Sequence, residues 1–186
     1  MRRKLMHSFG LPIPIGYYFV SRETLLMVLL PVFVLYAGAD LLRLYHKGFR
    51  RFFDRLITSR FLREREYRGL IGSTYFLIGA IAAILLYRRE AVITALFILL
   101  ISDTFASLVG SAWGKRRLFG PKTLEGSMAF LITALVVVFL SFPKPFPWGV
   151  ISALLCTVVE ALPWKIDDNL TLPLIGGGIL HLGLIT

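Results

Sequence analysis

The chain has 186 residues, 56% of them hydrophobic, and its mean hydropathy is +0.74. Several long apolar runs with few charges exclude an ordinary soluble protein and predict a single integral membrane domain, residues 1–186. The formal net charge is +10, but no basic surface is free of membrane segments. We therefore expect no nucleic-acid partner and assign the charge to loops that face anionic headgroups.

In chain order, seven apolar segments predict an all-α fold, a polytopic transmembrane helical bundle. The first segment follows a basic stretch, lacks a small-x-small cleavage site and contains Pro12 and Pro14, so we interpret it as retained and not as a cleaved signal. The first and last segments are short, and either one is compatible with a half-span or a broken helix. The seven candidates are residues 7–21, 24–43, 69–87, 90–113, 127–142, 147–163 and 171–186.

Residues 44–66 differ in kind, because apolar and basic side chains are interspersed at helical spacing. The apolar side chains fall on one face, and six arginines lie among them. We expect a basic amphipathic helix that lies in the membrane interface. The alternative is a solvated loop. The apolar face consists of Phe49, Phe52, Phe53, Leu56 and Ile57.

The distribution of Lys and Arg predicts the orientation of the bundle. With the N-terminus inside, the inner loops 1–6, 43–68, 114–126 and 164–170 hold 17 of the 21 basic residues, and the outer loops hold the other 4. If the first segment does not cross, the N-terminus moves outside and the later loops keep their sides. The polar loop 114–126 and the sequence WKIDDNL therefore share the cytoplasmic face, where nucleotides are found.

Asp103 lies within an apolar segment, where an aspartate costs about 3 kcal/mol at mid-membrane. Ser107, Gly110 and Gly114 follow it at steps of four, seven and eleven residues, so one face of the predicted helix is small and polar. Such a face indicates a functional site in the bundle interior. The alternative is close helix packing around a hydrogen-bonded aspartate.

A second group of carboxylates lies near the inner end of the sixth segment. Glu160 is followed by Asp167, Asp168 and Asn169, and oxygen ligands at this density suit Mg²⁺, which takes one or two carboxylates plus substrate phosphates. For one of the two adjacent aspartates, the alternative is an ordinary loop charge. Asp40, near the end of the second segment, can snorkel to the interface, and we do not assign it to the site.

The loop FGPKTLEGS, residues 119–127, has the composition of a phosphate-binding loop. Lys122 offers a cation, and Thr123, Gly126 and Ser127 open the fifth segment, where free N–H groups at a helix N-terminus attract phosphate. Glu125 favours that terminus but repels phosphate unless a metal or Lys122 intervenes. The nearby GSAWGK has three residues between its glycines where a Walker A loop has four, so it is not a P-loop.

Taken in order, SDTFASLVGSAWGKRRLFGPKTLEGS and TVVEALPWKIDDNLTLP resemble the dolichol kinase branch of the CTP-dependent polyprenol, phytol and diacylglycerol kinase family. The resemblance runs over nearly the whole chain and includes a basic opening with Arg3, Lys4 and His7. The family's acid–Asn pair is directly adjacent, which points to Asp168 with Asn169. The residues that carry the pattern are Asp103, Ala106, Ser107, Gly110, Gly114, Lys122, Thr123, Glu125, Gly126, Ser127, Glu160, Asn169 and Pro173.

The resemblance implies transfer of the γ-phosphate of CTP to a membrane lipid alcohol, with polyprenol or dolichol ahead of phytol-like isoprenoids and diacylglycerol. It implies Mg²⁺ held by Asp103, Asp168 and Asn169, with Asp103 or Glu160 taking the proton of the alcohol. Glu125 is a further candidate catalytic residue, although some branches carry alanine there. The implied nucleotide-binding residues are Lys122, Thr123, Gly126, Ser127, Gly110, Gly114, Lys4 and His7. A bundle of this size is also compatible with a homodimer.

Two other functions fit parts of the sequence. Phosphatidate cytidylyltransferases are similar in the middle of the chain, but their closing K-D-x-x-P-G-H-G-G-x-x-D-R signature is replaced by IDDNLTLPLIGGGILHLG. A small membrane transporter, which belongs to a different class, predicts internal repeats and a polar path across the whole bilayer. The sequence has no repeat, and its strongest polar residues gather toward one face, so we rank the lipid kinase first.

Overall fold

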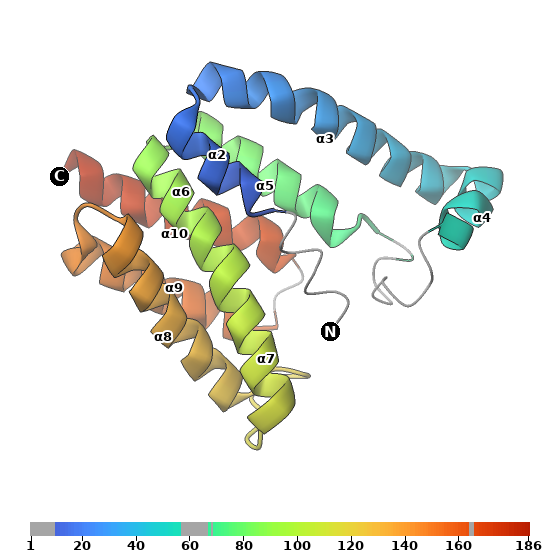
Figure 1. The fold of residues 1–186 in the computed structure, drawn as a ribbon. Helices are drawn as coiled ribbons and strands as arrows, with labels where there is room; N and C mark the ends of the chain where they lie inside the picture. The colour runs from blue at the N-terminus through green and yellow to red at the C-terminus, as the bar shows by residue number, and fades with distance from the viewer. Residues whose placement is uncertain (1–9, 57–66, 68, 164–165) are drawn as a thin grey trace.

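The structure is a computed structural model that describes residues 10–56, 67, 69–163 and 166–186. In these residues the fold is all-α, as predicted, apart from an isolated bridge between Arg117 and Thr123 (Figure 1). The helices are α2 (Pro12–Phe19), α3 (Arg22–Tyr45), α4 (Lys47–Leu56), α5 (Gly72–Leu86), α6 (Arg89–Phe97), η3 (Ile98–Ser102), α7 (Asp103–Trp113), α8 (Leu124–Ser141), η4 (Pro145–Gly149), α9 (Val150–Ala161) and α10 (Asp168–Ile185).

Within the described residues, four helices are long and apolar enough to cross a membrane, namely Arg22–Tyr45, Arg89–Trp113, Leu124–Ser141 and Asp168–Ile185. The ranges Gly72–Leu86 and Phe146–Ala161 form shorter apolar helices. Six of the seven predicted segments thus correspond to apolar helices, although the count of seven spans stays a prediction.

In the described part of the first predicted segment, residues 10–21, the short helix α2 is followed directly by the turn into α3. Eight residues at 1.5 Å each make a helix about 12 Å long, whereas the hydrocarbon core is about 30 Å thick. Helix α2 therefore cannot cross by itself, which favours the half-span interpretation of this segment.

The helix from Arg89 to Trp113 is continuous but irregular. Its middle, Ile98–Ser102, is a π-helical turn, and such turns are often found at functional sites. Before this turn, α6 is almost entirely buried; after it, Ala106 is the only buried residue of α7. Asp103 is the first residue of α7, so the π-turn lies where the helix leaves the core and the predicted site begins.

The apolar core lies on both sides of α6. On one side, α6 packs with α8, α9 and α10 through residues such as Ala95, Phe130 and Leu172. On the other side, it packs with α2, α3 and α5 through residues such as Tyr17 and Ile84. In Figure 1, α3 runs along the upper edge into α4, while α7 and α8 extend toward the lower edge. Packing in the core therefore fixes the positions of the helix ends, and these ends carry the charged residues.

At the predicted outer end of the bundle, three arginines bind carbonyl groups near the ends of helices. Arg22 donates to the carbonyl of Leu85, Arg89 to that of Val20 at 2.8 Å, and Arg88 to that of Leu184 at 3.3 Å. The last carbonyls of a helix lack partners within the helix, so these guanidinium groups satisfy them.

At the opposite end, Asp40 and Arg43 form a buried ion pair, each only 1% exposed. Asp40 Oδ1 accepts from Arg43 Nη2 at 2.6 Å, and Asp40 Oδ2 accepts from the Ile71 amide and the Thr74 hydroxyl, both at 2.8 Å. Asp40 therefore does not snorkel to the interface, which the sequence left open: this carboxylate faces inward and joins the end of α3 to the start of α5.

Helix α4 confirms the helical part of the amphipathic prediction over Lys47–Leu56, and residues 57–66 lie outside the described part of the chain. The ring of Phe53 lies under the Arg43 guanidinium, 5.6 Å from its carbon to the ring centroid. Arg50 and Arg51 are exposed. The contact of Phe53 with Arg43 holds α4 against the end of α3.

Candidate functional site

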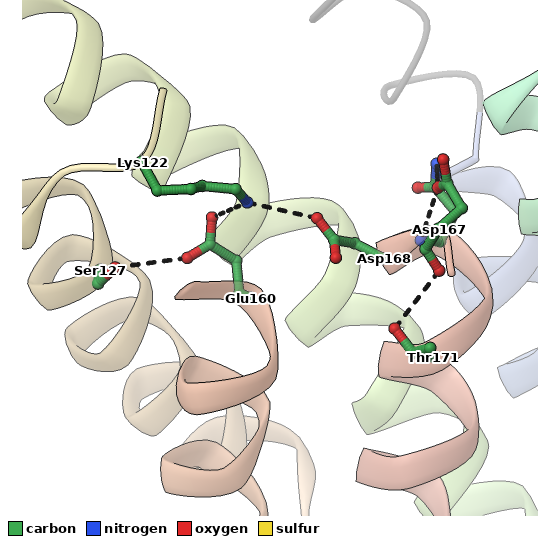
Figure 2. A network of polar contacts seen from close by, with 7 residues as sticks. Lys122, Ser127, Glu160, Asp167, Asp168 and Thr171 are labelled. Atoms are coloured by element: carbon green, nitrogen blue, oxygen red, sulfur yellow. Dashed lines mark hydrogen bonds and ion pairs between the residues drawn. The ribbon is translucent and has the colours of Figure 1, made fainter. Parts of the chain in front are cut away.

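Three helix ends meet at one polar cluster, shown in Figure 2. Lys122 comes from the loop before α8, Glu160 from the last turn of α9 and Asp168 from the first turn of α10. Lys122 Nζ donates to Glu160 Oε1 and, at 3.3 Å, to Asp168 Oδ2. Ser127 donates from its hydroxyl to Glu160 Oε2 at 3.5 Å. Side chains that are 38 and 46 residues apart in sequence thus form a single charged group.

A small hairpin positions Lys122. The amide of Leu118 donates to the carbonyl of Lys122 at 2.9 Å, and the amide of Lys122 donates to that of Phe119 at 3.0 Å. Gly120 sits in the turn with φ of 55°, a conformation that glycine adopts at little cost. The hairpin holds the backbone of Lys122 so that its side chain can reach Glu160.

Thr123 ends the hairpin and caps α8. Its hydroxyl accepts from the amide of Gly126 at 3.2 Å. The Cα atoms of Gly110 and Gly114 approach the same side chain closely, since an added Cβ would lie 2.9 Å and 2.8 Å from Thr123 Oγ1, respectively. These glycines let α7 pack tightly on the N-terminus of α8. The described contacts therefore give Gly110, Gly114 and Gly126 a packing function, and their assignment to nucleotide binding stays a prediction.

The amides at the start of α8 already have partners within the protein. Leu124 donates to the carbonyl of Arg116 at 2.8 Å, and Ser127 donates to that of Thr123 at 3.0 Å. A phosphate would have to displace these bonds to use the amides of this turn. Of the residues predicted to bind nucleotide here, Lys122 remains the strongest candidate.

Glu125 accepts from the amide of Arg116, at 3.3 Å to each carboxylate oxygen. This contact ties it to the hairpin, and none of the described contacts links it to Glu160 or Asp168. Glu125 thus has a structural partner, and its catalytic function stays a prediction.

The charged side chains of the cluster differ in how far they are exposed to solvent. The side chain of Lys122 is 28% exposed, that of Asp168 is 24% exposed and that of Glu160 is 4% exposed. Burial by itself lowers the pKa of Lys122, but Asp168 and Glu160 outweigh it and raise the pKa above its usual value. Asp103 also interacts electrostatically with Lys122. Among the described contacts, Lys122 is therefore shared between two carboxylates, Glu160 and Asp168.

The first turn of α10 carries two of the three residues predicted to bind Mg²⁺, namely Asp168 and Asn169. Asp167 is buried and caps the helix, because its Oδ1 accepts from the amide of Asn169 at 3.0 Å. The same oxygen accepts from the side-chain amide of Asn169 at 2.8 Å. Asp167 is therefore not a spare loop charge but a cap, and Asn169 is oriented by it. An aspartate directly before a helix is a recognisable capping signal, which the interpretation as a loop charge overlooked.

The structure thus brings together Lys122, Ser127, Glu160 and Asp168, and Asp103 interacts electrostatically with Lys122. The assignment of these residues to catalysis and binding stays a prediction. Lys4 and His7 lie outside the described residues. No group of three or more His, Cys, Asp and Glu side chains in the described ranges is arranged to hold a metal ion by itself. This finding does not test the predicted Mg²⁺ site, because Mg²⁺ commonly takes few protein ligands and completes its shell with phosphates and water.

Comparison with known proteins identifies relatives of this chain. An uncharacterized protein of Rickettsia prowazekii is 30% identical over 183 residues, which are 93% of this chain and 89% of the relative. CTP-dependent diacylglycerol kinase 1 of Schizosaccharomyces pombe is 27% identical over 161 residues, 77% of this chain and 73% of the relative. Dolichol kinase of Saccharomyces cerevisiae is 34% identical over 124 residues, 61% of this chain but only 24% of that protein. No protein-family model and no solved structure matches the chain.

The fold and the site define a class of protein, a helical membrane protein with a charged site at one end of its apolar helices. Within this class, the chain belongs to the family of CTP-dependent polyprenol and diacylglycerol kinases.

Proposed function

We propose that this chain is a CTP-dependent lipid kinase, which transfers the γ-phosphoryl group of CTP to the hydroxyl of a membrane lipid alcohol. The observation that carries the proposal is the contact of Lys122 with Glu160 and Asp168 at the ends of apolar helices. A phosphate-binding cation and several carboxylates then lie where a water-soluble nucleotide can meet a lipid hydroxyl. The relatives named CTP-dependent diacylglycerol kinase and dolichol kinase support both the donor and the kind of acceptor.

Phosphoryl transfer depends mainly on positioning and on stabilising charge. We propose that Lys122 Nζ leaves Glu160 and Asp168 and binds the phosphates when the nucleotide enters. Its release exposes carboxylate oxygens, the hard ligands that suit Mg²⁺, and a bound Mg²⁺ would supply positive charge to the phosphates. Asp168 and Asp103 are the proposed metal ligands, with Asn169 beside them.

The acceptor hydroxyl needs a base within hydrogen-bonding reach. Asp103 and Glu160 are both candidates, and Ser127 orients Glu160 through its contact with Oε2. The lipid tail would lie along the exposed apolar faces of the helices. The positive-inside distribution supports a cytoplasmic site, and the acceptor would then enter from the inner leaflet.

The test uses purified protein in mixed micelles with Mg²⁺ and γ-labelled CTP, and γ-labelled ATP in parallel. Polyprenol, dolichol, geranylgeraniol, phytol, diacylglycerol and phosphatidate are offered separately, and label is counted in the organic phase. We expect label from CTP in the phosphate of one lipid alcohol, and none with Asp103→Asn. Glu90→Gln is the matched control, because Glu90 is exposed and lies at the opposite end of the same continuous helix.

The same experiment tests the cytidylyltransferase alternative. If no lipid gains γ-label but α-labelled CTP produces a CDP-lipid from phosphatidate, the kinase proposal is wrong. If neither label enters any lipid, the chain does not act on lipid alcohols under these conditions. That result would favour the transporter alternative.

A further inference from the structure

The first turn of α10 has a backbone irregularity beside the site. Pro173 lies within this helix, four residues after Asn169. A proline has no N–H, so the carbonyl of Asn169 lacks the α-helical donor that residue 173 would otherwise supply. This oxygen belongs to the turn that carries Asp167 and Asp168.

Gly79 of α5 comes very close to this carbonyl. A Cβ atom added to Gly79 would lie 2.7 Å from the carbonyl oxygen of Asn169 and 3.2 Å from the Cα of Leu170. Both are backbone atoms, which cannot swing aside as the end of a flexible side chain can. Only glycine allows α5 and the start of α10 to approach this far, and Cα–H groups can contact a carbonyl oxygen favourably at such short range.

The N-terminus of α5, seven residues before Gly79, is itself fixed. Asp40 accepts from the amide of Ile71 and the hydroxyl of Thr74, and Arg43 donates to the carbonyl of Gly69 at 2.8 Å. Helix α5 is therefore held at its N-terminus and provides a firm support for α10 at Gly79.

From this geometry we propose that Gly79 is a positioning residue: it lets the first turn of α10 rest on α5 at the depth where Asp168 reaches the nucleotide site. The inference rests on the proposed function, because it assumes that Asp168 helps to bind the Mg²⁺–CTP complex. Gly79 does not touch the reacting groups. It acts through the backbone of Asn169, which shares a helical turn with Asp168.

The first test is Gly79→Ala, with Gly38→Ala as the control, since an added Cβ at Gly38 meets no atom within 4 Å. Equilibrium binding of CTP to the purified protein is measured with and without Mg²⁺, together with the melting temperature. We expect Gly79→Ala to weaken CTP binding in Mg²⁺ about tenfold, because small displacements of a binding group are costly. Binding without Mg²⁺, which depends on Lys122, should change little.

Pro173→Ala is the second variant, because Gly79→Ala can also impair folding. Alanine returns an N–H to the helix, so we expect the melting temperature to hold or rise while the enhancement of CTP binding by Mg²⁺ falls. A purely structural function of these residues would change the melting temperature and leave that enhancement intact.

The outcomes distinguish the positioning function of Gly79 from the proposed kinase function. If the wild type phosphorylates a lipid and Pro173→Ala and any folded Gly79→Ala keep the full Mg²⁺ enhancement, the positioning function is wrong and the proposed kinase stands. If the wild type neither binds CTP nor phosphorylates a lipid, the proposed function fails and this inference fails with it.

Discussion

Two ionic clusters lie at the predicted inner end of the bundle, and they differ in how far they are exposed to solvent and in how their charges are shared. Asp40 and Arg43 are each 1% exposed, and both oxygens of Asp40 accept hydrogen bonds. In the other cluster, one lysine serves Glu160 and Asp168, with Asp103 nearby, and Lys122 is 28% exposed.

The difference separates a structural cluster from the cluster that we propose to be functional. A closed ion pair with every oxygen satisfied cannot exchange partners without leaving a buried charge, so it holds helices together. In an open cluster, a partly exposed lysine shared between two carboxylates can exchange its partners at a lower cost. The presence of charge does not distinguish these cases, whereas burial and the way in which the charges are shared do.

The largest expected effect comes from Asp103→Asn. Removing one carboxylate from an open cluster should abolish lipid phosphorylation, by about a thousandfold or more, if this group binds the metal or accepts the proton. Asparagine has nearly the same size as aspartate and keeps an oxygen acceptor, so we expect the melting temperature to change little. Activity is measured in the mixed-micelle assay and stability by thermal unfolding in detergent. A large loss of stability instead would make Asp103 a structural residue like Asp40.

Arg43→Met tests the closed cluster. Removing one partner of a buried ion pair leaves an uncompensated charge, and we expect a loss of about 3–5 kcal/mol in the free energy of unfolding. The matched control is Arg50→Met on the exposed face of α4, which should lose little. The comparison between the clusters breaks down if Arg43→Met keeps its stability and loses activity.

Thr123→Ala should have an intermediate effect at the boundary of the open cluster. The helix α8 loses its cap, which costs about 1 kcal/mol, and the hairpin that carries Lys122 loosens. Thr123→Ser keeps the capping oxygen and is expected to recover most of the stability. Equal behaviour of the two variants would show that the methyl group, packed against Gly114, matters more than the cap.

The smallest effect concerns pH. The neighbouring carboxylates outweigh burial and raise the pKa of Lys122 above its usual 10.5. The contribution of the charged lysine to folding stability is therefore fully present below pH 10.5 and is lost only as the pH rises through the raised pKa. Between about pH 7 and pH 9, we expect Lys122 to stay charged and CTP binding to change little on its account. If wild-type protein loses CTP binding in this range and Lys122→Arg does not, the raised pKa of Lys122 is contradicted.

The sequence predicted those features of the fold that depend on the pattern of apolar and charged residues along the chain. Apolar runs located the helices, and the distribution of basic residues predicted that the loop with Lys122 and the segment with Asp168 share one face of the membrane. What it could not predict depends on distances between helices. The inward turn of Asp40, the orientation of Asn169 by Asp167 and the contact of α5 with α10 at Gly79 are all set by tertiary packing, which residue spacing does not encode.

The π-turn at Ile98–Ser102 has a consequence for chain length in this family. A π-turn accommodates one residue more than a regular helical turn, and each residue of an α-helix rotates the chain by about 100°. The extra residue is thus absorbed without rotating α7 about its axis. A relative that lacks one residue here can form a regular helix and still direct its aspartate as Asp103 is directed, so a one-residue gap before this aspartate would preserve the site.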